Sequence, residues 1–284
     1  MIPQPSITRR ILKSGFYKLY HPLSRLWRKL DHLASWKEVQ FWIENVPDAI
    51  FTPATYNSYA NWLHNQGFFA ALLNLYLDKP TPRIFDFGCG MGNLAPVCHY
   101  FVRNGGNYLG VDVDAVSIDA CHQTFKNLKN CSFYLTSDKN PYYPQSDPRR
   151  KGQAEIDWPV NNGTQDLVIA MSVFTHLQEK DALRYLEKIL KVLGSDGLAI
   201  ISFLVVRDYV NTNPVFNFTH PLTPGWFTSN PACPEMAIGV TQAALERLLT
   251  PRFSILKQIE GSATGGRKPC LQDIVILKKA SSIT

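Results

Sequence analysis

No acidic residue occurs among the first thirty residues, which contain seven basic ones: Arg9, Arg10, Lys13, Lys18, Arg25, Arg28 and Lys29. The full chain of 284 residues has 29 Lys and Arg against 23 Asp and Glu, a formal net charge of +6. The excess therefore lies in this N-terminal segment, and the rest of the chain is nearly balanced. A nucleic-acid-binding domain needs its basic excess on one face of the folded body. The composition gives no support for a nucleic-acid partner, and we expect none.

Long apolar runs and paired cysteines are also missing. The longest strongly apolar run covers residues 198–206 and is interrupted by Ser202, so it is too short to cross a bilayer. The N-terminus lacks the apolar region of a signal peptide. Six cysteines are present, but none form a Cys-x-x-Cys pair. We therefore expect reduced thiols, no bound metal and a cytoplasmic protein.

The chain divides near Pro80 and Pro82. Residues 1–80 are interpreted as a basic arm followed by a helical cap rich in Trp, Tyr and Leu. Residues 81–284 alternate between strand-like and helix-like segments, which indicates crossover units around a parallel sheet. The strands are expected at 83–87, 107–113, 131–136, 166–172, 197–206, 253–260 and 271–278, with an antiparallel final pair. This pattern predicts an α/β fold with a Rossmann-like, doubly wound, seven-stranded sheet whose last strand is antiparallel.

A glycine-rich loop follows the first expected strand and reads Gly88-Cys89-Gly90-Met91-Gly92-Asn93. Glycines there allow a sharp turn and close approach of a ligand. Nicotinamide-binding folds use Gly-x-Gly-x-x-Gly, and this chain has Asn93 where the last glycine would stand. Asp112 ends the second expected strand, where a carboxylate can accept both hydrogen bonds of a ribose diol. Either cofactor class would use such a carboxylate.

At this point the chain resembles the class I S-adenosylmethionine-dependent methyltransferases over residues 83–278. The motifs that carry the resemblance are Phe85–Gly92, Tyr108–Asp112, Ser137-Asp138, Asp166–Leu177 and Tyr185–Gly197. The resemblance implies S-adenosylmethionine as the cofactor and S-adenosylhomocysteine as its product. It also implies a methyltransferase activity, without specifying the acceptor.

The resemblance assigns roles to residues in these motifs. The loop glycines would pack against the methionine part, and Asp86 would help to hold its amino group. Asp112 would bind the ribose, and Asp138 would face the adenine amino group. Met171 and Ser172 would lie beside the sulfonium. The implied cofactor-binding residues are Asp86, Phe87, Gly88, Cys89, Gly90, Asp112, Val113, Asp138, Lys139, Met171 and Ser172. The alternative is that these carboxylates are solvated loop or turn residues.

His176 is the candidate catalytic residue. It comes four residues after Ser172, just beyond the fourth expected strand. A near-neutral imidazole there could remove a hydroxyl proton as the methyl group arrives. The spacing of Met171 and His176 is similar to that in plant-type O-methyltransferases that use a histidine base. A histidine that only packs against the strand end is the alternative.

Two long segments, 139–165 and 207–239, are expected to form walls of the acceptor site, because loops at the carboxyl ends of strands carry specificity in this architecture. Satellite core packing is the alternative. The candidate substrate residues are Tyr143, His220 and Trp226 in these segments, and Tyr59 and Trp62 in the helical cap.

The function expected is methylation of a small molecule, most favourably O-methylation of a natural product, sugar or peptide-derived acceptor. One alternative is N- or C-methylation of a lipid-like or quinone-like acceptor at a membrane surface. The other is a non-catalytic partner protein with the methyltransferase fold. The basic residues 1–30 could contact a membrane surface or a partner protein, and the sequence leaves the oligomeric state open.

Overall fold

The computed structural model describes residues 58–136, 158–207, 216–250, 252–263 and 270–280. By contact the chain separates into two compact units, Met1–Asp48 and Ala49–Thr284. All described elements belong to the second unit, including the long helix α3 (Tyr59–Tyr76) that precedes the first strand. The division expected near residue 80, between a helical cap and the methyltransferase domain, stays a prediction. The basic arm lies outside the described residues.

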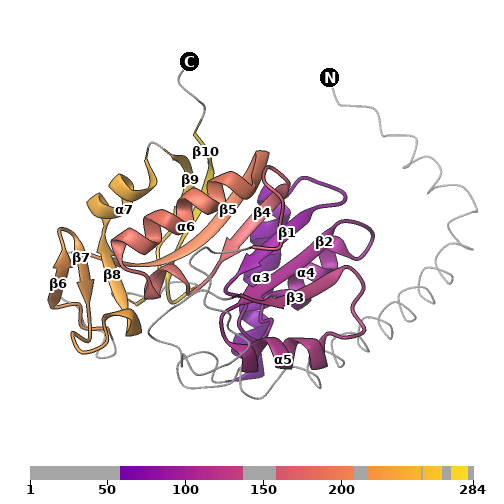
Figure 1. Ribbon diagram of the computed structural model, residues 1–284, viewed down its shortest axis with the longest axis horizontal. Helices are drawn as coiled ribbons and strands as arrows, with labels where there is room; N and C mark the ends of the chain where they lie inside the picture. The colour runs from indigo at the N-terminus through magenta and orange to yellow at the C-terminus, as the bar shows by residue number, and fades with distance from the viewer. Residues whose placement is uncertain (1–57, 137–157, 208–215, 251, 264–269, 281–284) are drawn as a thin grey trace, which may run out of the picture. The chain divides into compact units, whose positions relative to one another are not determined.

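The main sheet has the expected connectivity (Figure 1). Its order runs β3, β2, β1, β4 and β5, all parallel, and β10 then pairs antiparallel with both β5 and β9. The strands are β1 (Arg83–Phe87), β2 (Asn107–Asp112), β3 (Cys131–Leu135), β4 (Gln165–Ala170), β5 (Leu193–Val206), β9 (Phe253–Ile259) and β10 (Asp273–Lys279). The predicted α/β fold with antiparallel final strands is confirmed.

Three short strands extend the sheet beyond the seven expected. They are β6 (His220–Thr223), β7 (Trp226–Thr228) and β8 (Ile238–Thr241). β8 pairs in parallel with Leu204–Val206 at the end of β5, just beyond the part of β5 that pairs with β10. The sequence predicted a loop here because strands of three or four residues, one of them containing Pro221, are too short to display alternation.

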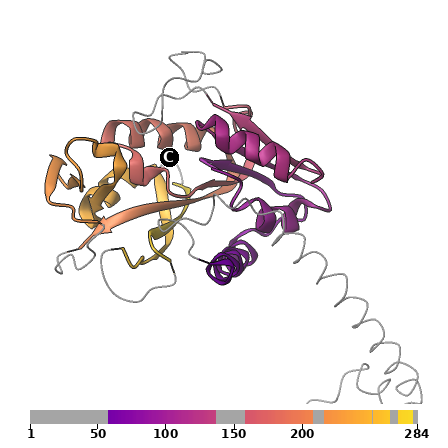
Figure 2. The same ribbon diagram turned by 90° about the horizontal axis from the view of Figure 1, so that it is seen from below.

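Helices cover both faces of the sheet. Helices α6 (Glu179–Val192) and α7 (Gln242–Leu249) lie on one face, while α3 and α4 (Ala95–Val102) lie on the other (Figures 1 and 2). The remaining helix, α5 (Ala115–Thr124), connects β2 to β3, and Asp114 caps it by accepting a hydrogen bond from the Ser117 amide. Two short 3₁₀ turns, η2 (Phe174–His176) and η3 (Pro234–Met236), complete the elements.

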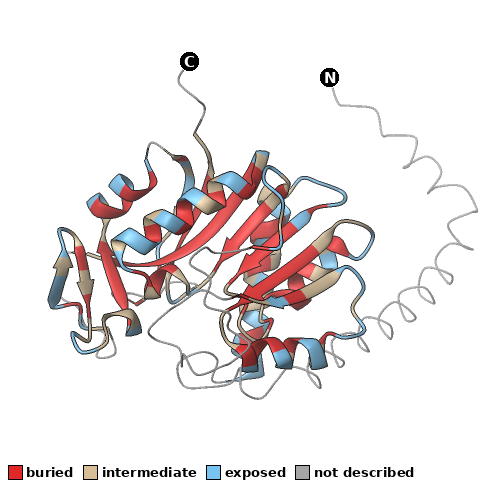
Figure 3. Cartoon of the chain, viewed as in Figure 1, coloured by how far each residue is buried: buried red, intermediate tan, exposed pale blue. Residues whose placement is uncertain are grey.

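The core lies in the central strands (Figure 3). β1 and β4 read as nearly continuous apolar runs because each is covered on both faces. Helix α6 contributes Ala182, Tyr185, Leu186 and Ile189 to this core, a spacing that follows one helical face. The rigid centre fixes where β1, β2 and β4 end. In the described part of the chain, no helix is both long and apolar enough to cross a membrane.

Candidate functional site

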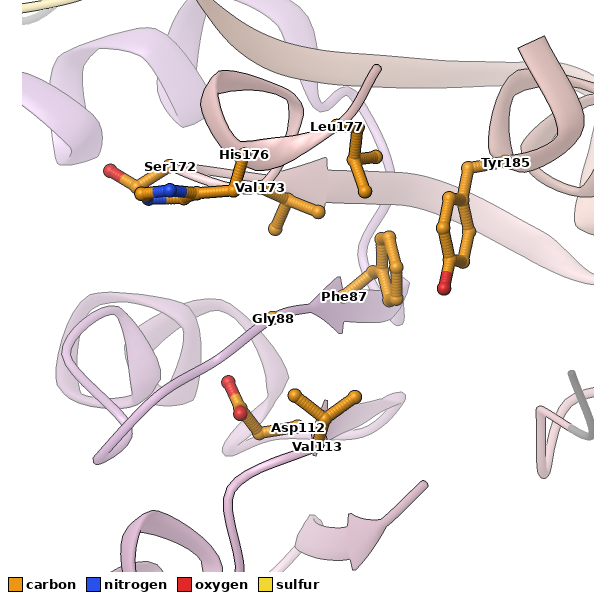
Figure 4. Close-up of a pocket in the computed structure, with 9 residues that line it drawn as sticks. All are labelled: Phe87, Gly88, Asp112, Val113, Ser172, Val173, His176, Leu177 and Tyr185. Carbon is orange, nitrogen blue, oxygen red and sulfur yellow. The ribbon is translucent and has the colours of Figure 1, made fainter. Parts of the chain in front are cut away.

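A pocket opens at the carboxyl ends of β1, β2 and β4, where an open α/β sheet binds its ligand (Figure 4). It is lined by Phe87, Gly88, Asp112, Val113, Ser172, Val173, His176, Leu177 and Tyr185. Its empty volume, counted out to the open mouth, is about 480 Å³. Figure 4 shows Asp112 and Val113 opposite Ser172 and His176, with Gly88 between them.

Gly88 forms the floor of the pocket. Its φ is +77°, which favours glycine, and a Cβ atom there would lie 2.3 Å from Cγ2 of Val173. Gly90 and Gly92 also have positive φ, at +53° and +79°. The loop therefore needs glycine for its turn, and Gly88 also lets the Val173 side chain pack against it.

The amides of this loop point inward. The Gly88 and Cys89 amides both donate to the carbonyl of Val111, at 2.8 and 3.0 Å, and the Gly92 amide donates to the Cys89 carbonyl. The Gly90 amide donates to the Asp112 carboxylate at 2.8 Å. A phosphate-binding loop leaves such amides available to its anion. This loop uses them to hold its own shape, which disfavours a dinucleotide pyrophosphate as the ligand.

Asp112 is held between the loop and the next helix. One carboxylate oxygen accepts from the Gly90 amide and the other from the Asp114 amide, each at 2.8 Å. Burial raises the pKa of Asp112 above its usual value, and these amide hydrogen bonds oppose that shift. The carboxylate is thus fixed in place at the wall of the pocket. Its oxygens keep further lone pairs that can accept hydrogen bonds from a diol.

Asp86 lies beneath the loop and does not line the pocket. It is 2 % exposed, and one of its oxygens accepts from the Tyr108 hydroxyl at 2.6 Å. Burial raises the pKa of Asp86 to about 7, although the hydrogen bond from Tyr108 opposes the shift. The expected contact with a cofactor amino group stays a prediction.

His176 faces the pocket from η2. Its Nδ1 lies 2.7 Å from the carbonyl oxygen of Glu235, so Nδ1 carries the proton that it donates. Burial lowers the pKa of His176 below its usual value, although hydrogen bonds to the backbone of Glu235 and Met236 oppose this shift. The imidazole is therefore neutral near pH 7, with its ring orientation fixed by η3.

Aromatic side chains form another wall. Phe87 lies 4.8 Å from Tyr185 and 4.9 Å from Trp158 between ring centroids. Tyr185 comes from α6 and Trp158 from the segment before β4. Trp158 packs against Phe87 and Tyr185 without lining the pocket. The largely apolar surface of the pocket comes from Phe87, Val113, Val173, Leu177 and Tyr185.

The structure brings together many of the residues expected from the sequence. Phe87, Gly88, Asp112, Val113, Ser172 and His176 all line the pocket. Cys89 and Gly90 belong to the loop beneath it, and Met171 directly follows β4. Asp138, Lys139 and Tyr143 lie outside the described residues, together with part of each expected wall, so their roles stay predictions.

The other substrate candidates do not line the pocket. Trp62 is 1 % exposed and donates from Nε1 to the Asn93 side chain at 2.9 Å, whereas Tyr59 lies at the start of the same helix. Trp226 is buried in the main core, and His220 is exposed on β6. Their assignment to the substrate gains no support from these positions and stays a prediction.

Sequence reasoning did not assign Val173, Leu177 and Tyr185 to the pocket. All three fall inside quoted motifs, but apolar residues next to a strand end cannot be told from core residues by pattern alone. These three residues line the pocket only because η2 and α6 pack beside the carboxyl end of β1.

Comparison with known proteins agrees with this geometry. The family model described as "Methyltransferase domain" matches residues 59–230, more than half of the chain. The PH0226 protein from Pyrococcus horikoshii OT3 is similar in structure, with a TM-score of 0.55 and 15% identity over 84% of this chain and 98% of that one.

Two further solved structures share the fold. Magnesium protoporphyrin IX methyltransferase from Synechocystis PCC 6803, with bound SAH, has a TM-score of 0.51 and 16% identity over 86% of this chain and 95% of that one. Geranyl diphosphate C-methyltransferase from Streptomyces coelicolor A3(2) has a TM-score of 0.50 and 12% identity over 76% and 81%. The family match, the sheet order and the glycine loop agree, and the chain belongs to the class I S-adenosylmethionine-dependent methyltransferases.

Proposed function

We propose that this enzyme transfers the methyl group of S-adenosylmethionine to an oxygen atom of a small, largely apolar molecule. The observation that carries the proposal is the arrangement of the pocket, with Asp112 on one side and a neutral His176 on the other. The inward-turned loop amides support a cofactor without phosphates in preference to a dinucleotide.

The described residues fit this cofactor. Gly88 lines the pocket without a side chain, so its backbone can approach the ligand closely. Asp112 would accept the ribose hydroxyls, and Val113 would contact the adenine. Ser172 would lie near the reacting end. When bound, S-adenosylmethionine supplies an electrophilic methyl group on a positively charged sulfur. In the described part of the chain, no group of His, Cys, Asp and Glu could hold a metal ion.

His176 is the residue that favours oxygen as the methylated atom. With the proton on Nδ1 donated to Glu235, the basic lone pair is on Nε2. Nε2 takes the proton of the acceptor hydroxyl as the new carbon–oxygen bond forms. General-base assistance of this kind contributes about 10²–10⁴-fold to a rate. The chain's other contribution is to hold the reacting groups in line and to exclude water.

The acceptor class follows from the pocket wall. Phe87, Val173, Leu177 and Tyr185 offer apolar and aromatic surface, which suits a medium-sized apolar molecule such as a natural product. The similar structures act on chemically different molecules, a magnesium porphyrin in one case and geranyl diphosphate in another. An N- or C-methyltransferase acting on a lipid-like acceptor is the second candidate, and a non-catalytic partner protein is the third.

Calorimetry with S-adenosylhomocysteine tests the cofactor assignment. We expect Asp112→Ala to weaken binding about tenfold or more, because hydrogen bonds to a charged group are lost. Asp196→Ala is the matched control, since Asp196 is exposed and pairs with Lys278 at the surface. Wild-type protein that fails to bind S-adenosylhomocysteine, or unchanged binding by Asp112→Ala, would contradict the assignment.

Methyl transfer tests the role of His176. Using labelled S-adenosylmethionine and extracts of the source cells, we expect His176→Gln to lower transfer by about 10²-fold or more while S-adenosylhomocysteine binding is retained. His122→Gln, at an exposed position of α5, is the control. Full activity of His176→Gln would favour N- or C-methylation. Cofactor binding by wild-type protein without transfer to any acceptor would favour the non-catalytic alternative.

A further inference from the structure

Three side chains from three neighbouring strands form a closed ring of hydrogen bonds beside the pocket. The Ser172 amide, just after β4, donates to Oγ of Ser202 on β5 at 2.8 Å. The Ser202 hydroxyl donates to Oε1 of Gln272 at 2.5 Å. Nε2 of Gln272, just before β10, donates back to Oγ of Ser172 at 2.8 Å.

The Gln272 amide is oriented with Oε1 toward Ser202 and Nε2 toward Ser172, and this orientation sets the directions of its two hydrogen bonds. A backbone amide can only donate, so Ser202 Oγ accepts from Ser172 and must use its own proton elsewhere. That proton goes to Gln272, whose Oε1 therefore faces Ser202. Nε2 of Gln272 then faces Ser172 and donates to its Oγ.

The hydroxyl proton of Ser172 is not used by any hydrogen bond of this ring. Because Ser172 Oγ accepts from Gln272, its own hydroxyl proton is directed away from Gln272. Ser172 lines the pocket and is exposed, and Figure 4 shows it beside His176 at one end of the pocket. The backbone of Ser172 has φ +57°, an uncommon conformation for a residue other than glycine that occurs often at functional sites.

The ring is firmly anchored. Ser202 is 0 % exposed within β5. Asp273, the next residue after Gln272, is also buried and forms an ion pair with Arg207, and it pairs with Phe203 in the sheet. Gln272 therefore has little freedom to move away from Ser172.

We propose that Gln272 is a positioning residue that fixes the Ser172 hydroxyl as a hydrogen-bond donor toward an oxygen atom of the bound ligand. The inference rests on the proposed function. Two ligands supply an oxygen with free lone pairs at this end of the pocket: the carboxylate of the cofactor, and the methyl acceptor.

The variant Gln272→Glu changes residue 272 from a hydrogen-bond donor to an acceptor toward Ser172, with almost no change in the shape of the side chain. A carboxylate accepts hydrogen bonds and cannot donate them, so it keeps the bond from Ser202 and also takes the Ser172 proton. Ser172 then presents only lone pairs to the pocket. Ser172→Gly removes the hydroxyl altogether and, because φ is positive there, introduces no backbone strain.

Binding is measured by calorimetry with two nucleosides, S-adenosylhomocysteine and 5′-methylthioadenosine, which lacks the amino-acid part. If Ser172 donates to the cofactor carboxylate, both variants bind S-adenosylhomocysteine about tenfold or more weakly than wild-type protein does, and they bind methylthioadenosine equally well. If Ser172 donates to the acceptor, both nucleosides bind normally. In that case the KM of both variants rises about tenfold or more for the acceptor, which is supplied as the cell-extract fraction that wild-type protein methylates.

The double variant decides whether Gln272 acts through Ser172. In the Ser172→Gly background, Gln272→Glu should have no further effect. Gln258→Glu is the matched control, because it makes the same change on β9, where Gln258 pairs with Gln242.

Three results would overturn the inference: unchanged binding and transfer in both variants, equal weakening of both nucleosides, or a full effect of Gln272→Glu without Ser172. Wild-type protein that binds neither nucleoside would instead overturn the proposed function, and this inference with it.

Discussion

At Gly88, the absence of a Cβ atom lets the Val173 side chain pack against the loop at the pocket. Replacement by alanine would place a Cβ 2.3 Å from Val173 and would force an unfavourable φ of +77°. We expect Gly88→Ala to abolish S-adenosylhomocysteine binding in calorimetry and to lower the free energy of unfolding by about 1–3 kcal/mol.

Gly67 provides the matched control for this substitution. It lies within α3, and a Cβ there would meet nothing within 4 Å. Gly67→Ala should stabilise the protein by about 0.5–1 kcal/mol, since alanine is the better helix former, without changing binding. Normal binding by Gly88→Ala would show that the loop can shift to accept a side chain.

The residues of the site differ in how well the sequence reveals them. Gly88 and Asp112 could be predicted because the glycine spacing and the acid at a strand end are local patterns. Gln272 could not be given a role, because it meets Ser172 one hundred residues away and only the antiparallel pairing of β10 with β5 brings them together. Asp86 illustrates a further limit, because its burial beneath the loop depends on Tyr108 in the next strand.

At the scale of elements, β5 joins two groups of strands. Its central residues pair with β4 and β10, and its last three pair with β8. The sequence predicted the apolar centre of β5 but not its earlier start at Leu193, because Gly194 and Gly197 suggested a turn there. It also missed β6, β7 and β8, since such short strands are stabilised by their neighbours more than by their own pattern.

The ion pair of Arg207 with Asp273 fastens the end of β5 to the start of β10. Asp273 is almost fully buried and also accepts a hydrogen bond from the Val205 amide. Asp273→Asn removes the charge that a mostly buried Arg207 faces, so we expect a loss of about 3 kcal/mol in the free energy of unfolding. Urea denaturation measures this loss.

The exposed pair of Lys278 with Asp196 serves for comparison. Asp196→Asn should cost less than about 1 kcal/mol, because water and salt screen a surface pair. Equal effects of the two substitutions would mean that the buried pair contributes little to holding the two strands together.

At the scale of the whole molecule, Asp86 links stability to pH. Its pKa is about 7 in the folded protein and 3.8 as the unperturbed reference value, so the folded state holds a proton that the unfolded state has lost between these values. Stability from this group is fully present below pH 4 and falls as pH rises toward 7, by up to about 1.4 kcal/mol for each pH unit.

Asp86→Asn isolates this contribution, since an amide oxygen can still accept from Tyr108. The lowered pKa of His176 acts in the opposite direction, because its neutral folded form loses stability as pH falls. Subtracting the free energies of unfolding of wild-type protein and Asp86→Asn, measured by urea denaturation at each pH, cancels the contribution of His176. We expect the variant to gain stability relative to wild-type protein from pH 5 to 8, whereas parallel curves would contradict the raised pKa.

The net positive charge of the chain comes from residues that do not line the pocket. The seven basic residues of the arm precede the described residues, and the proposed contact with a membrane surface or partner protein stays a prediction. The pocket itself is lined by one carboxylate, two hydroxyls, one imidazole and apolar side chains.

The hydrogen bonds made by the amides of the glycine loop also affect which nucleotides the pocket can bind. Cells contain nucleotides whose adenosine part resembles that of the cofactor but whose phosphates need amide donors. In this loop, the amides of Gly88, Cys89, Gly90 and Gly92 donate to Val111, Asp112 and Cys89, so these four donors are not available to a phosphate. The loop therefore offers a phosphate fewer hydrogen bonds than a loop that keeps all of its amides free, which favours a cofactor without phosphates over ATP and NAD.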